Sequence, residues 1–346
     1  MKIGNFEFNK NSVVFIIAEL SANHNGSLET AIETIRAAKR AGADCIKFQT
    51  YTADTITINS HRDDFLIKGT IWDGRNLYEL YQEAYTPWEW HKQLFEVAAE
   101  EGLVCFSSPF DKTAVDFLET LNVPAYKIAS FEITDIPLIE YVASKGKPII
   151  LSTGIATTED IELALDACRR MGNNDIALLK CTSSYPAPID EANMCMVKDL
   201  AERYNVISGL SDHTIGSTVP VVATCFGTKI IEKHFILDRS IGGPDASFSM
   251  NEEEFTAMVK AIREAESAIG MVDYTLTEKQ VKGKDFSRSL YVVEDMKAGD
   301  IITENNVRSI RPGFGLHPKF YREIIGKTIK DNVNFGDRVD ITNINI

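Results

Sequence analysis

The sequence predicts a (β/α)₈ barrel followed by a small β-rich domain. Three observations lead to this fold class. Apolar segments of strand length alternate with amphipathic helical segments over about 270 residues, in the eightfold repeat that such a barrel requires. Polar residues gather at the C-terminal ends of the strand segments, where barrels build their active sites. Beyond residue 270 the alternation stops and the chain becomes polar and rich in turns.

The predicted strands share a run of aliphatic or aromatic residues that closes on polar side chains. They are residues 13–20, 45–51, 103–110, 125–130, 148–154, 176–186, 206–213 and 229–236. Helical periodicity indicates helices that include 27–42, 87–102, 114–121, 136–146 and 157–172, with a last helix at 250–270. An open doubly wound sheet is the alternative, but no glycine-rich dinucleotide fingerprint follows the first strand. The barrel is therefore preferred.

Two segments depart from the regular repeat. Residues 52–86 form a long connection after the second strand, and connections of that length are commonly lids or specificity elements. The change in character near the C-terminus divides the remainder of the chain. We expect a barrel domain at 1–270, a polar linker at 271–285 and a turn-rich β domain with one short helix at 286–346.

Bulk composition argues against several classes of protein. The formal net charge is -14, whereas general nucleic-acid binding needs a basic surface. No apolar run approaches the ~20 residues of a membrane span, and the N-terminus lacks the layout of a signal peptide. The six cysteines show no metal-knuckle or redox-motif spacing, so we interpret them as reduced, buried thiols. We therefore expect a soluble, cytoplasmic protein that binds neither nucleic acid nor membrane.

Two histidines end consecutive predicted strands, His213 in GLSDH and His234 in IIEKH. Adjacent strand ends bring the two rings close enough to share one ion, and imidazole nitrogen suits Mn, Fe, Co or Zn. Each histidine could instead be satisfied by a neighbouring backbone group, but the matched pair favours the metal. Because the protein supplies only two nitrogens, water and substrate would take the other positions, and the metal would be an accessible Lewis acid.

Lysines and serines at neighbouring strand ends predict a pocket for a dianion such as a phosphate. Lys47 and Lys127 lie in runs that are otherwise too apolar for a charge, and serines end nearby strands at Ser130, Ser152 and Ser211. Lysine supplies point charge, and hydroxyl or backbone donors complete the shell. The alternative for each lysine is an ammonium group that reaches solvent at the rim.

Other polar residues of the same rim suit proton transfer and sugar binding. Glu19 ends the first strand and can move protons near a metal, although it equally suits an ion pair with Lys47 or Lys127. Candidates for orienting a polyol are Gln49, Tyr185, Asp245 in the loop LDRSIGGPD and Arg311 in IRPGFG. The loop around Asp245 and the arginine are equally open to purely structural interpretations.

Eight ordered motifs resemble the sialic acid synthase family of nonulosonic acid synthases. They are IAELSANHNGSLETA, GADCIKFQTY, YKIASFEITDIPLI, PIILSTGIAT, CTSSYPAP, GLSDHTIG, IIEKHFILDRSIGGPD and IRPGFG. The resemblance covers nearly the whole chain and implies a TIM barrel with a C-terminal antifreeze-like (SAF) domain. It also implies an enzyme that condenses phosphoenolpyruvate with an N-acylated amino-sugar.

The resemblance further implies a role for each candidate residue. A divalent metal, usually Mn²⁺ with Mg²⁺ or Co²⁺ as alternatives, would be held by His213 and His234. Phosphoenolpyruvate would be held by Lys47, Lys127, Ser130, Ser152, Ser211 and Ser183, the last standing where the family commonly has Asn. Glu19 matches the acid/base glutamate, and the sugar-side residues are Gln49, Tyr185, Asp245 and Arg311. In the family this arginine reaches the partner's barrel in a domain-swapped homodimer, because the SAF domain caps the neighbouring subunit.

Within the family the chain resembles the pseudaminate-forming branch, through FQTYTADTIT, IWDGRNLYELYQEAYTPWEWH, FSSPFD and IASFEITD. This branch implies a specific acceptor, 2,4-diacetamido-2,4,6-trideoxy-β-L-altropyranose. The nearest rival is a synthase for a manno-configured sugar that forms N-acetylneuraminate or legionaminate. More distant rivals are an aldolase with a Schiff base on Lys127 or Lys47, and a carbohydrate- or ice-binding protein that uses the SAF-like domain alone.

Overall fold

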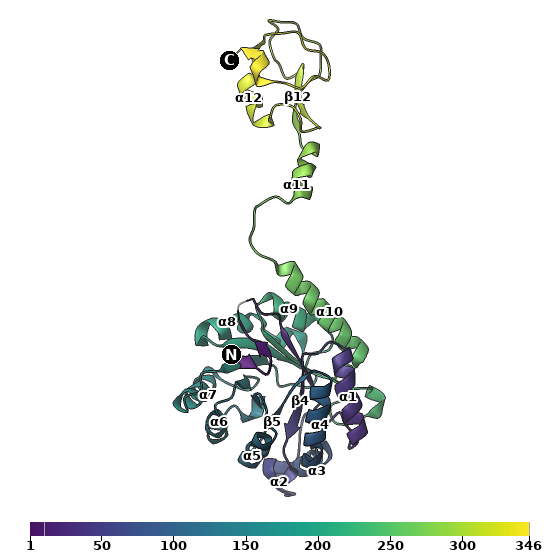
Figure 1. The fold of residues 1–346 in the computed structure, drawn as a ribbon, viewed down its shortest axis with the longest axis vertical. Coiled ribbons are helices and arrows are strands. Elements are labelled where there is room, and N and C mark those ends of the chain that lie inside the picture. The colour runs from purple at the N-terminus through teal and green to yellow at the C-terminus, as the bar shows by residue number, and fades with distance from the viewer. Residues whose placement is uncertain (10, 346) are drawn as a thin grey trace. The chain divides into compact units, whose positions relative to one another are not determined.

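The protein forms two compact units, Met1–Gly270 and Met271–Ile346, in a computed structural model that describes residues 1–9 and 11–345 (Figure 1). The first unit is a closed barrel of eight parallel strands, which confirms the predicted fold class. The strands are β3 (Phe15–Glu19), β4 (Cys45–Thr50), β5 (Val104–Pro109), β6 (Tyr126–Ile128), β7 (Ile149–Ser152), β8 (Ile176–Cys181), β9 (Ile207–Asp212) and β10 (Ile230–His234). Pairing of β10 with β3 closes the barrel.

Helices surround this barrel, as Figure 1 shows. They are α1 (Leu28–Arg40), α4 (Trp88–Glu100), α5 (Lys112–Thr120), α6 (Ile136–Ala143), α7 (Thr158–Arg170), α8 (Cys195–Tyr204), α9 (Thr218–Cys225) and α10 (Glu252–Ile269). Several begin at a side chain that accepts hydrogen bonds from the free backbone N–H groups of the first turn, namely Ser27, Asp111, Asp135, Thr157 and Asn251. These caps fix where each helix starts relative to the strand before it.

Alternation of side chains along the strands separates the apolar layer from the polar interior. Ile16 and Ala18 of β3 belong to the same apolar cluster as Ala31 and Ile35 of α1. Glu19 lies one position further along and points to the opposite face of the strand. The sheet thus buries aliphatic residues against the helices and leaves the inner face of the strand ends free for polar groups.

The long connection after β4 has regular structure of its own. It contains α2 (Ala53–Ile56), the 3₁₀ turn η1 (Asp63–Phe65) and α3 (Leu77–Ala84). Between η1 and α3, residues 66–76 fold into a small antiparallel hairpin, which we call the mouth hairpin. Its ladder includes the Ile67 N–H to Arg75 O bond of 2.9 Å and the Gly74 N–H to Ile67 O bond of 2.8 Å.

The remaining strands and helices include several that the sequence analysis did not assign. A short N-terminal hairpin of β1 (Lys2–Ile3) and β2 (Phe6–Glu7) precedes the barrel. The segment expected as a plain linker contains α11 (Glu278–Gly283) and η5 (Lys284–Phe286), because Thr277 and Gln280 form a reciprocal capping box. Further 3₁₀ turns are η2 (Ser130–Glu132), η3 (Ile189–Glu191) and η4 (Arg239–Ile241).

The second unit is small, turn-rich and built of short strands. They are β11 (Ser289–Val292), β12 (Val307–Ile310), β13 (Thr328–Ile329) and β14 (Ile344–Asn345), with η6 (Pro318–Phe320), α12 (Tyr321–Ile324) and η7 (Ile341–Asn343). Leu290, Val292, Met296, Ile302 and Val307 form the centre of its own apolar core. In residues 1–9 and 11–345, no helix is long and apolar enough to cross a membrane.

The cysteines are free thiols in the described part of the chain, but two of them are not buried. Cys195 and Cys225 are exposed, so the expectation of burial is wrong for these two. Both lie on outer helices, α8 and α9, whose solvent-facing positions alternate with apolar ones. An apolar sequence context therefore did not guarantee burial, because helical periodicity decides which face a residue occupies.

The buried side chain of His91, in α4, forms a hydrogen bond with the last residue of β4. The His91 Nε2 atom lies 2.8 Å from Thr50 Oγ1, and its Nδ1 atom lies 3.1 Å from Pro87 O. Burial lowers the pKa of His91 to about 4. Because the unfolded chain binds a proton there at higher pH than the folded chain does, stability contributed by this group is lost as pH falls below about 6.5.

We expect the His91→Gln variant to show a weaker loss of stability than the wild type between pH 6.5 and pH 4. The difference should approach about 3 kcal/mol in the free energy of unfolding, the equivalent of the pKa shift. Urea unfolding at a series of pH values measures it, with exposed His61→Gln as the matched control. Identical pH dependence in wild type and His91→Gln would contradict the assignment.

Candidate active site

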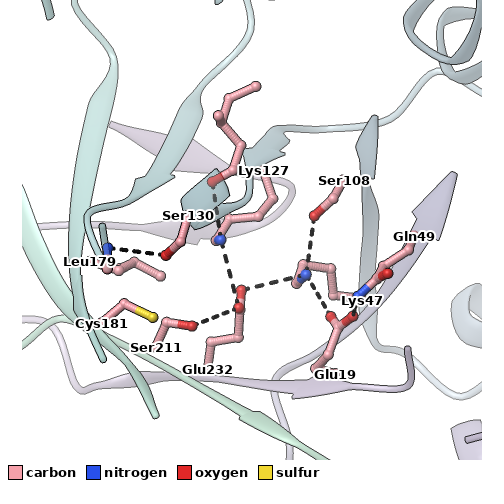
Figure 2. Close-up of polar contacts among 12 residues, drawn as sticks. Glu19, Lys47, Gln49, Ser108, Lys127, Ser130, Leu179, Cys181, Ser211 and Glu232 are labelled. Atoms are coloured by element: carbon pink, nitrogen blue, oxygen red, sulfur yellow. Dashed lines mark hydrogen bonds and ion pairs between the residues drawn. The ribbon is translucent and has the colours of Figure 1, made fainter. Parts of the chain in front are cut away.

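Two carboxyl and two ammonium groups lie together inside the barrel, as Figure 2 shows. The Nζ atom of Lys47 is 2.6 Å from Glu19 Oε2 and 3.8 Å from Glu232 Oε2. Lys127 approaches the same Glu232 carboxyl, with its Nζ atom 3.7 Å from Oε1. All four side chains are buried. Mutual pairing offsets the large cost of removing these charges from water.

Strand register explains why these groups meet. Glu19 lies opposite Lys47 in the β3–β4 pair and opposite His234 in the β3–β10 pair. Ser211 lies opposite Glu232 in the β9–β10 pair and donates its hydroxyl to Glu232 Oε1 at 3.0 Å. Parallel strands in register thus bring polar residues that are far apart in sequence to one level of the barrel.

Burial and charge separate the proton affinities of the two carboxyl groups. Burial raises the pKa of Glu19; the Lys47 ammonium opposes this shift and the Glu232 carboxylate adds to it. Burial by itself would raise the pKa of Glu232 as well, but the Lys127 and Lys47 ammonium groups lower it below its ordinary value. Glu19 is therefore the carboxyl that holds a proton more readily, which suits proton transfer.

Serine hydroxyls lie close around Gly154, just beyond the end of β7. The Gly154 N–H donates to Ser130 Oγ at 3.1 Å. A Cβ atom at Gly154 would lie only 2.1 Å from Ser183 Oγ and 2.6 Å from Ser130 Oγ. Ser152 Oγ is buried and has no hydrogen-bond partner among the described residues. An unpaired buried hydroxyl is costly, so its presence favours a ligand with acceptor oxygens at this place.

The two candidate metal ligands face each other at adjacent strand ends. The ring centroids of His213 and His234 are 5.3 Å apart. His213 Nδ1 lies 3.1 Å from Thr182 O, while His234 Nδ1 is buried without a hydrogen-bond partner in the described chain and lies 3.7 Å from Asp245 Oδ2. Burial lowers the pKa of His234 well below its ordinary value, which favours the neutral imidazole that metals bind.

These histidines fit a metal with open coordination positions. In residues 1–9 and 11–345 no group of three or more His, Cys, Asp or Glu side chains has metal-binding spacing. The histidine pair is the candidate protein part of such a site, and the unpaired Nδ1 atom of His234 is the observation that favours a ligand there. Two imidazole ligands leave room for substrate oxygens and water.

Three of the four sugar-side candidates, Gln49, Tyr185 and Asp245, lie next to the acid/base and metal candidates. Gln49 Nε2 donates to Glu19 Oε1 at 3.1 Å and to Ser21 Oγ at 2.9 Å. The Tyr185 ring lies 4.4 Å from the His213 ring. Candidates that the structure gathers at this end of the barrel are Glu19, Lys47, Gln49, Lys127, Ser130, Ser152, Ser183, Tyr185, Ser211, His213, His234 and Asp245. Arg311 belongs to the second unit, where its side chain is exposed.

Sequence reasoning missed three residues of this site. Glu232 joins Lys47 to Lys127, and strand alternation from His234 could have placed it on the same inner face. Gly154 gives no signal in a single sequence, because its importance rests on how closely hydroxyls approach it. Glu132 follows Ser130; one of its carboxyl oxygens is buried without a partner in the described residues, and burial raises its pKa to about 7.

Comparison with known proteins assigns the family. The NeuB family profile matches residues 34–274, and the SAF domain profile matches residues 287–337. The chain belongs to the NeuB family. The resemblance noted from the motifs is thereby confirmed.

Two synthases and one solved structure show how far the similarity extends. A pseudaminic acid synthase from Campylobacter jejuni is 52% identical over 337 residues, 97% of this chain and 98% of its own length. An N,N'-diacetyllegionaminic acid synthase from Legionella pneumophila is 35% identical over 327 residues, 93% and 92% of the two chains. The crystal structure of the N-acetylneuraminic acid synthetase from Leptospira borgpetersenii in complex with citrate has a TM-score of 0.73 at 29% identity, covering 82% of this chain and 94% of that one.

The Gly154→Ala variant should bind phosphate or phosphoenolpyruvate at least about tenfold more weakly, a loss of about 1.4 kcal/mol. The reason is that the new Cβ atom would overlap the hydroxyls of Ser183 and Ser130. Isothermal titration calorimetry measures the affinity, and a thermal melt checks that the variant is folded. Gly283→Ala is the control, because a Cβ there meets nothing within 4 Å. Wild-type affinity in folded Gly154→Ala would show that the anion binds elsewhere.

Proposed function

We propose that this protein is a pseudaminic acid synthase, a transferase. It condenses phosphoenolpyruvate with 2,4-diacetamido-2,4,6-trideoxy-β-L-altropyranose and water to give pseudaminate and phosphate. The observation that carries the proposal is the 52% identity to a pseudaminic acid synthase over nearly the full length of both chains. Identity falls to 35% for a legionaminic acid synthase, which supports this branch over the manno-configured alternative.

The buried charges suit the binding of phosphoenolpyruvate and the departure of its phosphate. Lys47 and Lys127 carry the positive charge, and the serine hydroxyls around Gly154 offer donors for the remaining oxygens of phosphoenolpyruvate. In the reaction C3 of phosphoenolpyruvate bonds to the aldehyde carbon of the opened sugar, and water adds at C2. The C2–O bond then breaks, and the two ammonium groups stabilise the charge on the leaving phosphate.

Glu19 is the proton-transfer group that we propose. Its raised pKa keeps it able to accept and return a proton, and Gln49 fixes its orientation through a hydrogen bond to Oε1. It either takes the proton from the water that adds at C2 or assists opening of the sugar ring. Lys47 at 2.6 Å stabilises the carboxylate form whenever the proton has left.

A divalent metal completes the proposed site, held by His213 and His234. When bound, it supplies a Lewis acid that polarises an oxygen atom of a substrate. We propose Mn²⁺, with Mg²⁺ or Co²⁺ as alternatives. Burial lowers the pKa of His234, and this shift together with the unpaired Nδ1 atom supports metal binding by the pair.

We further propose that the enzyme works in the cytoplasm as a domain-swapped homodimer. In this arrangement Arg311 reaches the sugar in the partner's barrel. Exposed apolar side chains at the start of the second unit support a covering partner, because Met271, Val272 and Tyr274 are 86%, 90% and 94% exposed. The exposed position of Arg311 is consistent with a role outside its own unit.

The proposed reaction predicts phosphate release from phosphoenolpyruvate that depends on the altro-configured diacetamido sugar and on Mn²⁺. A colorimetric phosphate assay compares this sugar with N-acetylmannosamine and the corresponding diacetamido-trideoxy mannose. EDTA and the His213→Ala variant should each abolish turnover, because both remove the metal. Phosphate release with a manno-configured sugar instead would support the proposed reaction but contradict the proposed acceptor. No phosphate release with any of the three sugars would refute the proposed function.

The swapped arrangement predicts that two inactive variants restore activity when mixed. In a heterodimer of Glu19→Gln with Arg311→Ala, one barrel has an intact Glu19 and receives an intact arginine from its partner. After random subunit exchange, about a quarter of the wild-type activity should return. If Arg311 acted within its own chain, mixing would restore nothing.

A further inference from the structure

The mouth hairpin carries an indole ring across the end of the barrel. Trp72 lies in the turn of this hairpin, in the connection that leaves β4. Its Nε1–H donates to Pro244 O at 3.0 Å, in the loop after β10. Its ring lies 5.7 Å from that of Tyr185, in the loop after β8, the strand opposite β4 in the barrel order. One side chain thus links three loops around the mouth.

Hydrogen bonds fix the shape of this hairpin. Buried Asn76 donates from Nδ2 to Ser60 O at 2.7 Å and accepts from the Tyr78 N–H at 2.9 Å, which ties the hairpin to the start of α3. Within the turn, the Trp72 N–H donates to Thr70 Oγ1 at 3.2 Å. The hairpin is therefore held in place at its base and at its tip, so the position of the indole is defined by the fold.

The chemistry of the exposed part of Trp72 is apolar. Its only polar atom already donates to Pro244 O, so the ring offers a ligand its faces and edges alone. The ring centroids of Tyr185 and Phe248 are 5.2 Å apart, and those of Phe248 and His234 are 4.9 Å apart. Trp72, Tyr185 and Phe248, which we call the mouth aromatic group, contact one another in sequence beside the candidate metal ligands. Phe248 is buried, so Trp72 and Tyr185 supply the partly exposed rings. Exposed aromatic rings bind the C–H faces and methyl groups of ligands.

We propose that Trp72 determines acceptor specificity by packing against the apolar substituents of a 4-acetamido, 6-deoxy sugar. This inference rests on the proposed function. An N-acetylhexosamine with hydroxyls at C4 and C6 would place a polar group against the indole, where it loses water without gaining a partner. Because both diacetamido-trideoxy sugars share these substituents, Trp72 selects the substituents and leaves the ring configuration to other residues.

A purely structural role for Trp72 makes different predictions. As a latch, it would act through its bond to Pro244 O, and Trp72→Phe would then be as damaging as Trp72→Ala. As a substrate contact, it acts through the ring, and phenylalanine retains most of the effect. Exposed Ile71, which neighbours it in the same hairpin, provides a matched control for removing an apolar side chain from this turn.

Steady-state kinetics of the full-length enzyme test the proposal. We expect Trp72→Ala to raise the KM for the diacetamido-trideoxy sugar at least about tenfold, the scale of a lost aromatic contact, without changing the KM for phosphoenolpyruvate. Its preference over N-acetylmannosamine should fall by a similar factor. The acceptor KM of Trp72→Phe should stay within about threefold of the wild-type value, and the acceptor KM of Ile71→Ala should equal the wild-type value. Unchanged acceptor KM and preference in folded Trp72→Ala would overturn the proposal, as would equal losses in both Trp72 variants.

Fluorescence separates this inference from the proposed function. Acceptor added with Mn²⁺ and inorganic phosphate should change the tryptophan emission of the wild type, and Trp72→Phe should lose that change. If only the manno-configured diacetamido sugar turns over, the proposed function fails, but the same pattern of KM values upholds the role of Trp72. If no sugar turns over, the fluorescence titration tests the inference by itself. An emission change that persists in Trp72→Phe would overturn the inference, and so would the absence of any emission change with every sugar.

Discussion

The buried network of two carboxyl and two ammonium groups is the constraint on which the rest of the site depends. Glu19, Lys47, Lys127 and Glu232 lie on four strands of the barrel, β3, β4, β6 and β10, and balance one another's charge. None of them could be buried alone at an acceptable cost in free energy. The balance also keeps two ammonium groups inside the barrel, which is the charge that the proposed binding of phosphate requires.

Strand register determines which groups of this network lie next to one another. Glu19 has Lys47 on one side and His234 on the other, so the acid/base candidate lies at the same level as one candidate anion ligand and one candidate metal ligand. A second constraint on the site is steric. Gly154 has no room for a side chain beside the hydroxyls of Ser130 and Ser183, so this arrangement requires glycine at the position.

In the proposed function, chemistry and selectivity are carried by different parts of the fold. The candidate groups for binding charge and moving protons stand on or next to the barrel strands. The mouth hairpin belongs to the long connection after β4, and it reaches loops on other strands through Trp72. This division lets a family keep one reaction while its loops adapt to different sugars. On this proposal, a sequence change in the hairpin would alter the acceptor without disturbing the buried charges.

The sequence by itself determined the barrel, the small second unit and most of the residues at the mouth. It could do so because strand and helix periodicities are local, and because barrels gather the C-terminal ends of their strands. Strand alternation could have placed Glu232, but Gly154 and Trp72 escaped the sequence for a different reason. Their roles rest on contacts with residues brought close by the fold, such as the bond from Trp72 to Pro244, 172 positions away. Only the tertiary structure decided those contacts, because distances between segments are set by register and loop geometry, which no local pattern of residues encodes.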